Sequence, residues 1–137
     1  MGITLLTTLG ATLIQQVYGA IEDGAQKHTS AGDPLGIRQK APIATSGDSV
    51  YVAWWSNKTG NDEVMFKAST DGGKTFADKM NLSNSTTAQS QDAQIAASGN
   101  NVYVSWWERN QTSNEPVMKV SNDNGKTFGE KIMLSEK

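Results

Sequence analysis

The chain repeats itself once, without a gap, at a spacing of 52 residues. The segment 43–83 aligns with 95–135, so that Ile43 matches Ile95 and Asp71 matches Asp123. The longest matched stretches are IATSGDSVYVAWW at 43–55 and IAASGNNVYVSWW at 95–107. A repeat of this length, rich in strand and turn residues, is not typical of helical solenoids, whose units are usually shorter. We therefore predict two similar β-modules, the first at 41–88 and the second at 89–137.

Each module contains one almost continuous apolar and aromatic run, at 50–55 and at 102–107. Successive side chains of a strand point to opposite faces, so both faces of these strands are apolar. A central strand buried on both faces suits a β-propeller, in which each blade packs between two neighbours. We predict an all-β fold made of two four-stranded antiparallel β-propeller blades. The flanking strands are expected at 42–45, 63–68 and 74–82, and at 94–97, 115–120 and 126–134.

A tight turn with the same pattern precedes the fourth predicted strand of each module. It reads STDGGKTF at 69–76 and SNDNGKTF at 121–128. A short Asp side chain can accept hydrogen bonds from nearby backbone amides, Gly supplies positive φ, and Ser and Thr hydroxyls can satisfy further backbone groups. The aromatic ring would cover the hairpin. The residues of the pattern are Ser69, Asp71, Gly73, Thr75 and Phe76, and Ser121, Asp123, Gly125, Thr127 and Phe128.

This pattern resembles the Asp-box, SxDxGxTW/F, also called the bacterial neuraminidase repeat (BNR), of sialidase-like β-propellers. Phe replaces the commoner Trp in both copies, and the resemblance covers about 95 of the 137 residues. It implies a propeller fold, and it implies a structural role, because Asp-boxes of that family lie in peripheral hairpins. Calcium binding through Asp71 or Asp123 is the alternative, but the repeated carboxylates of a calcium loop are missing.

The resemblance also raises the question of catalysis. Sialidases of that family hold the substrate carboxylate with three arginines, attack with a tyrosine activated by a glutamate, and use an aspartate as acid and base. This chain has two arginines, Arg38 and Arg109, and lysine does not replace bidentate guanidinium recognition. Tyr51 and Tyr103 occupy equivalent positions, which favours repeated core residues. We predict no catalytic residue, no cofactor and no metal, with a fragment or relative of an exo-α-sialidase-type glycoside hydrolase as the alternative.

Paired tryptophans in the two central runs offer a binding hypothesis. Trp54 and Trp55, like Trp106 and Trp107, sit inside apolar strands, which favours packing, although aromatic faces also stack on sugar rings. The predicted ligand contacts are Trp55, Trp107 and Arg109. Four Asn-x-Ser/Thr sequons are predicted glycosylation sites, namely Asn57, Asn81, Asn84 and Asn110.

Residues 1–40 differ in character from the repeat. Residues 3–14 are apolar and threonine-rich, and a small-residue pattern follows, as in secretory signals, but no basic residue precedes Lys27. We interpret 1–19 as a signal peptide, with an N-terminal helix or strand, or a start site that clips a longer precursor, as alternatives. The polar stretch 20–40 is interpreted as a linker. Polar interruptions argue against a membrane span, and the expected location is secreted or cell surface.

The net charge of −2 and the lack of a basic run argue against nucleic acid as a partner, and the lack of cysteine excludes disulfides. Two blades alone would leave apolar faces uncovered, since propellers use about 4 to 8. We therefore expect self-association, as in a six-bladed ring of three copies, or a partner that completes the ring. The chain could instead be a truncated relative of a longer propeller.

The function predicted from the sequence is that of a noncatalytic exported repeat protein that binds glycans or cell-surface proteins. A vestigial structural repeat protein without a ligand is the remaining alternative. Sequence patterns alone do not separate these two hypotheses, because a binding loop and an idle loop use the same turn residues.

Overall fold

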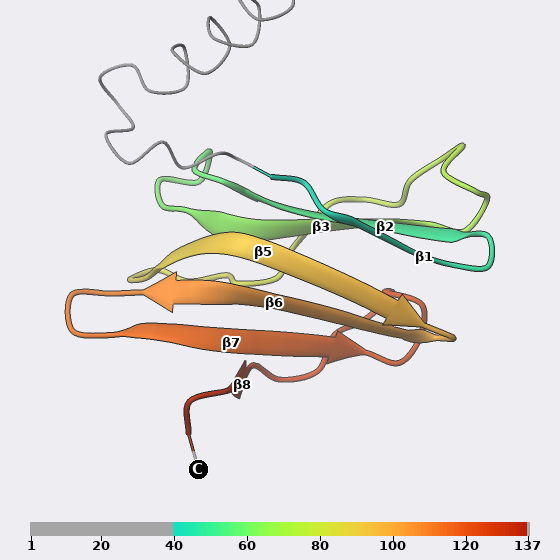
Figure 1. Cartoon of the computed structure of the whole chain (residues 1–137). Helices are drawn as coiled ribbons and strands as arrows, with labels where there is room; N and C mark the ends of the chain where they lie inside the picture. Colours follow the sequence, from blue (N-terminus) through green and yellow to red (C-terminus); the bar gives the residue numbers. More distant parts are fainter. Residues whose placement is uncertain (1–39, 137) are drawn as a thin grey trace, which may run out of the picture. The chain divides into compact units, whose positions relative to one another are not determined.

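The computed structural model describes residues 40–136, which form two four-stranded antiparallel sheets and no helix (Figure 1). The prediction of an all-β fold with two such sheets is confirmed for these residues. The signal peptide or helix expected at 1–19, and all of the linker at 20–40 except Lys40, lie outside the described residues. The strands are β1 (Ile43–Ser46), β2 (Ser49–Ser56), β3 (Glu63–Ser69) and β4 (Met80–Asn81), then β5 (Gln89–Ser98), β6 (Asn101–Arg109), β7 (Asn114–Ser121) and β8 (Ile132–Met133).

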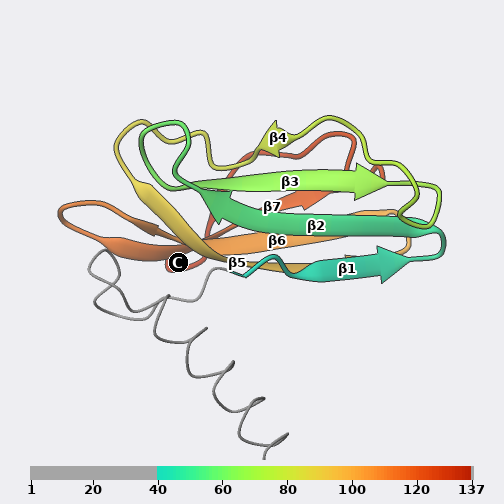
Figure 2. The same ribbon diagram turned by 90° about the horizontal axis from the view of Figure 1, so that it is seen from above.

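Both sheets are meanders in which each strand pairs with the next one along the chain. Their orders are β1-β2-β3-β4 and β5-β6-β7-β8, and the first can be followed across Figure 2. The hairpins that open the sheets have the same register, since Thr45 lies opposite Val50 and Ala97 opposite Val102. Gly47 and Gly99 begin the two connecting turns with φ near +58° and +57°, a backbone conformation that favours glycine.

The fourth strands are shorter than predicted. Only Met80–Asn81 and Ile132–Met133 pair with β3 and β7, in place of the nine-residue strands expected at 74–82 and 126–134. The residues after each turn form hydrogen bonds outside the regular strand pairing. In the first sheet, the Thr75 amide donates to the Asp71 carboxylate at 2.8 Å and the Ala77 amide donates to the Ala68 carbonyl at 2.9 Å. The turn chemistry therefore competes with the sheet ladder for these residues.

The first strand of the second sheet is longer than predicted. The expected strand covered 94–97, whereas β5 runs from Gln89 to Ser98. A bulge lies between Gln91 and Gln94, and Asp92 within it has φ of +55°. Extra residues of this kind bend a strand and increase its twist, so the polar half of β5 leaves the regular ladder but continues to pair with β6.

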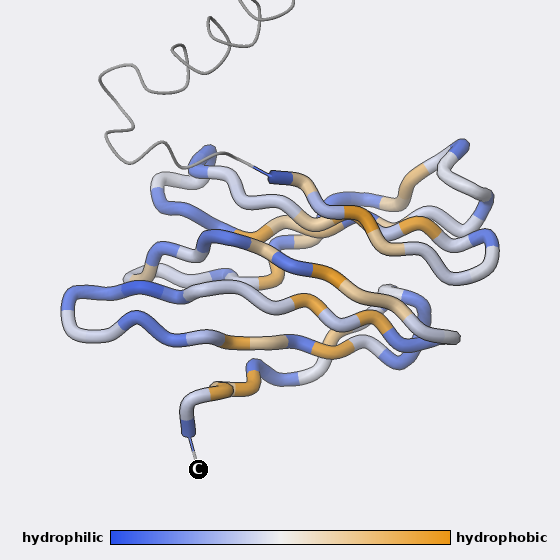
Figure 3. The backbone as a smooth tube through the Cα atoms, in the orientation of Figure 1, coloured by the Kyte–Doolittle hydropathy of each residue, from blue (hydrophilic) through white to orange (hydrophobic). Residues whose placement is uncertain are grey.

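The two sheets share one apolar core. Tyr51 and Ala53 of β2 are fully buried in it, together with Val102, Val104 and Trp106 of β6. These residues define the inner faces of the two sheets, and apolar stretches along the strands are visible in Figure 3. The Phe66 ring is stacked near Tyr51, with centroids 6.1 Å apart, and meets the Phe128 ring edge-on at 4.9 Å.

Among the described residues, each central strand is buried on one face only, although both of its faces are apolar. On the outer face of the first sheet, Val50, Val52 and Trp54 are only half-buried, and on that of the second sheet Tyr103 and Trp107 are 37% and 45% exposed. Each sheet has one neighbouring sheet among the described residues, so full burial is reached on one face only.

Candidate functional site

The two Asp turns, 69–76 and 121–128, are closed by the same hydrogen bonds. In the first, the Ser69 hydroxyl donates to Asp71 Oδ1 at 2.7 Å, and the Thr75 hydroxyl donates to Asp71 Oδ2 at 2.5 Å. The Gly73 amide donates to Ser69 Oγ at 2.9 Å. The second turn repeats these bonds through Ser121, Asp123, Gly125 and Thr127, with distances of 2.7, 2.5 and 2.9 Å.

These bonds fix the charge of the two carboxylates. The hydroxyl of Thr75, then its amide and the Ser69 hydroxyl, stabilise the ionised form and lower the pKa of Asp71 to about 2. Thr127 and Ser121 lower the pKa of Asp123 to about 2 in the same way. A carboxylate that stays ionised and accepts several protein donors is poorly suited to exchange protons near neutral pH. The geometry thus favours a role in shaping the turn.

The predicted ligand contacts do not all come together. Trp107 and Arg109 lie at one end of the second sheet and share a groove of about 120 Å³. Trp55 instead packs against the core shared by the two sheets. The other residues that line the groove were not identified from the sequence, and they are Gln89, Gln91, Asp92 and Asn114.

Cross-strand register explains why these side chains converge. Gln91 lies opposite Trp107, and Arg109 lies between Gln89 on β5 and Asn114 on β7. Residues directly opposite one another in antiparallel strands point to the same face. The groove residues of β5 could not be found in the sequence because the strand predicted at 94–97 begins only after Gln91. The segment 89–94 is polar at every position except Ala93, so it offered no strand periodicity.

Asp62, in the connection between β2 and β3, holds the glutamines of the groove in place. Its amide donates to Gln89 Oε1 at 2.6 Å, its carbonyl accepts from the Ser90 amide at 2.7 Å, and its carboxylate accepts a bond from Gln91 Nε2. Trp107 is 45% exposed and needs no rearrangement to meet a ligand. The groove therefore combines an open aromatic ring with positioned amides and a guanidinium group.

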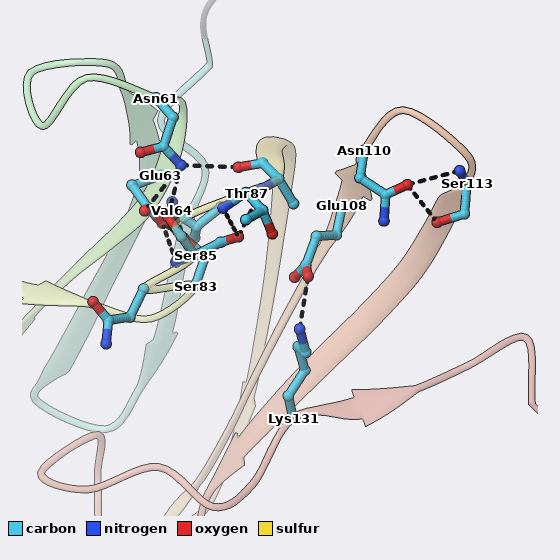
Figure 4. A network of polar contacts seen from close by, with 12 residues as sticks. Asn61, Glu63, Val64, Ser83, Ser85, Thr87, Glu108, Asn110, Ser113 and Lys131 are labelled. Carbon is cyan, nitrogen blue, oxygen red and sulfur yellow. Dashed lines mark hydrogen bonds and ion pairs between the residues drawn. The ribbon is translucent and has the colours of Figure 1, made fainter.

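A second polar cluster surrounds Glu63, which is only 3% exposed (Figure 4). Its carboxylate accepts bonds from the Ser83 hydroxyl, from the Ser85 amide at 3.1 Å and from Asn61 Nδ2 at 3.2 Å. Asn61 also donates to the Ser85 and Ala88 carbonyls at 2.7 and 2.9 Å. These contacts fasten the connection from β4 to β5, which is the expected use of a buried carboxylate surrounded by donors.

The remaining predicted residues lie at the surface. Asn57 and Asn110 follow the ends of β2 and β6, and Asn81 and Asn84 lie in and just after β4, all four exposed. Asn110 Oδ1 accepts bonds from the Thr112 and Ser113 amides at 2.8 and 2.9 Å and shapes its own turn. Nearby, Lys131 and Glu108 form an ion pair of 2.6 Å (Figure 4).

No protein-family model matches the chain, and no curated protein matches its sequence. Within residues 40–136, no three or more His, Asp or Glu side chains gather as a metal site would require. The same residues contain no helix that is long and apolar enough to cross a membrane.

Proposed function

We propose that the two sheets are neighbouring blades of an Asp-box β-propeller and that the protein is an exported, noncatalytic binding module. The blade assignment is supported by the 52-residue repeat, by two meanders in the same strand order, and by Asp turns that agree bond for bond. Stacked four-stranded meanders are the building units of propellers. Export rests on the apolar segment 1–19 and the exposed sequons.

The proposed ligand is a glycan, bound at the groove of Trp107 and Arg109. The observation that carries this proposal is the exposed indole ring of Trp107 among amide and guanidinium groups. The face of an aromatic ring suits the apolar face of a sugar, while amides and Arg can bond its hydroxyls in fixed geometry. The groove is smaller than the roughly 300–1,000 Å³ of drug-sized sites, which favours a single terminal sugar unit.

Catalysis is not part of the proposal. Glycoside hydrolysis generally uses two carboxyl groups that face each other across the substrate. Asp71 and Asp123 are committed to their own turns, and Glu63 is committed to the β4–β5 connection. The groove itself offers one carboxylate, that of Asp92.

Binding of the full chain to a glycan array, followed by titration of the best sugar, tests the proposal. We expect Trp107→Ala to weaken that binding at least about tenfold, and Arg109→Lys to weaken it less, because the charge remains but the bidentate geometry is lost. Lys58→Ala, at the corresponding end of the first sheet, is the matched control and should bind normally. Absence of any bound glycan, or equal binding by Trp107→Ala, would overturn the proposal.

A further inference from the structure

The large apolar side chains that remain exposed belong to the outward sides of the two sheets. Their counterparts at the 52-residue offset are all buried in the core between the sheets or packed against it. Tyr103, Trp107, Ile132 and Leu134 in the second sheet correspond to Tyr51, Trp55, Met80 and Leu82 in the first. Ile43 and Phe76 in the first sheet correspond to Ile95 and Phe128 in the second.

This correspondence makes the outer faces similar to the inner ones, with replacements such as Met118 for Phe66 and Pro116 for Val64. The outer face of the second sheet repeats the side chains by which the first sheet contacts the second. The outer face of the first sheet, with Val50, Val52 and Trp54, repeats the residues Val102, Val104 and Trp106. The chain therefore carries close counterparts of both halves of its internal interface a second time, on opposite sides, and within residues 40–136 no sheet packs on them.

We propose that a second copy of the chain docks head to tail on these faces. The outer face of the first sheet in one copy covers the outer face of the second sheet in the next, in the arrangement that the two sheets adopt within one chain. Burial of exposed aromatic and aliphatic surface drives the contact, and its two sides are complementary because the internal interface already uses them. This inference does not rest on glycan binding.

Specific internal contacts have counterparts in the proposed interface. The edge-on pair of Phe66 and Phe128, 4.9 Å apart, becomes a contact of Met118 with Phe76 of the second copy, and Met packs well against aromatic rings. The Ser46 hydroxyl donates to the Gly99 carbonyl at 3.0 Å between the sheets. Its counterpart is a bond from Ser98 to the Gly47 carbonyl of the second copy.

The internal bond made by Tyr51 is among those without a counterpart. The Tyr51 hydroxyl donates to Asn124 Oδ1 at 3.4 Å, but Gly72 stands at the repeat position of Asn124. Tyr103 would therefore contribute packing without this bond, and the contact between copies should be weaker than the contact between the sheets of one chain. Separable copies are the expected consequence.

A head-to-tail contact either closes into a ring or grows into a fibre. Closed propellers contain about 4 to 8 blades, so two to four copies would complete one, and we expect three copies with six sheets. The groove would lie at the rim of the interface. Trp55, the counterpart of Trp107, stays partly exposed, and Asn57, the counterpart of Arg109, stays exposed.

Light scattering coupled to size exclusion tests the interface on the full chain at about 10 µM. The unaltered protein should have three times the chain mass. Ile132→Asp with Leu134→Asp blocks the outer face of the second sheet, and Ile43→Asp with Phe76→Asp blocks that of the first. Each double variant should be a monomer. Mixed in equal amounts, they should form a dimer, because one intact face of each kind remains.

Lys58→Asp, in a loop away from both faces, is the control and should keep the mass of the unaltered protein. Thermal unfolding checks that each double variant is folded. Two single variants, Leu134→Ser and Phe76→Ser, provide a milder pair that can be mixed in the same way. A monomeric unaltered protein overturns the proposal. A mixture of folded blocked variants that stays monomeric also overturns it, because the two outer faces would then not be partners.

Discussion

The two sheets of this protein have nearly the same sequence pattern but opposite burial. Tyr51 on β2 is fully buried, whereas Tyr103, at the same repeat position on β6, is 37% exposed. The valines that precede these tyrosines show the opposite difference, since Val102 on β6 is fully buried and Val50 on β2 is half-buried. The residues at these positions are identical, so the side on which the neighbouring sheet lies decides which of them enters the core. The sequence repeat therefore predicts that the two sheets have the same local structure. It does not predict that equivalent side chains contribute equally to the free energy of unfolding.

The largest expected effect separates the two tyrosines. Tyr51→Ala should lower the free energy of unfolding by about 4 kcal/mol, because truncation of a buried aromatic side chain leaves a cavity. Tyr103→Ala should lower it by about 1 kcal/mol or less. Urea denaturation of both variants at a protein concentration low enough to keep copies apart measures the difference. Similar losses in the two variants would mean that Tyr103 is as well packed within one chain as Tyr51.

The next comparison concerns the glycines of the Asp turns. A Cβ on Gly125 would lie 2.7 Å from Phe66 Cζ, whereas one on Gly73 would meet only Val50 at 3.7 Å. Both glycines have positive φ, so Gly73→Ala should cost about 1–2 kcal/mol through backbone strain. Gly125→Ala adds a steric clash and should cost about 2–4 kcal/mol. Equal losses in urea denaturation would contradict the close approach of the Phe66 ring.

The Asp turns themselves should behave alike in both sheets. Their folded-state pKa values of about 2 lie below the ordinary value of 3.8, so each carboxylate contributes stability that is fully present above pH 4 and is lost as pH falls towards 2. Asp71→Asn and Asp123→Asn should each reduce the fall in Tm between pH 5 and 2, by similar amounts. A pH dependence unchanged in either variant would show that its turn does not hold an ionised carboxylate.

The smallest effect concerns one ion pair at the surface. Lys131 pairs with Glu108 at 2.6 Å, while the counterparts in the first sheet, Lys79 and Ser56, cannot form such a pair. Lys131→Ala should cost about 0.5–1 kcal/mol, and less at high salt, because the Lys131 side chain is 35% exposed and the pair is partly screened, whereas the Glu108 side chain is only 14% exposed. Lys79→Ala should have no measurable effect. A salt-independent loss in Lys131→Ala would point to packing of its aliphatic chain.

The sequence predicted the central strands closely because their pattern is local. The runs at 50–55 and 102–107 lie within Ser49–Ser56 and Asn101–Arg109, and the third strands at 63–68 and 115–120 are equally close to β3 and β7. The fourth strands were overextended, since the competing bonds of the Asp turns reach residues four positions ahead. The bulge in β5, and with it the groove, depends on bonds to Asp62 about 27 residues earlier in the chain.

Of the groove residues, the sequence singled out Trp107 and Arg109 by residue type alone; it also named Trp55, which packs against the core instead. Residue type does not tell which of two adjacent tryptophans faces a neighbouring sheet. Trp106 is 2% exposed and Trp107 is 45% exposed, although both lie in one apolar run. The amides that complete the groove come from β5 and β7, and only the register of these strands with β6 brings them beside Trp107 and Arg109.

By itself, the sequence determined the two sheets, their hairpins and the Asp turns, because each depends on bonds between residues close along the chain. The tertiary structure decided which faces became core, where β5 bends, and which side chains line the groove. These features arise where one sheet meets the other, and hydrophobic burial has no direction until a partner surface is in place. A repeated segment forms the same strands and turns twice, and the position of the neighbouring sheet decides which face of each copy is buried.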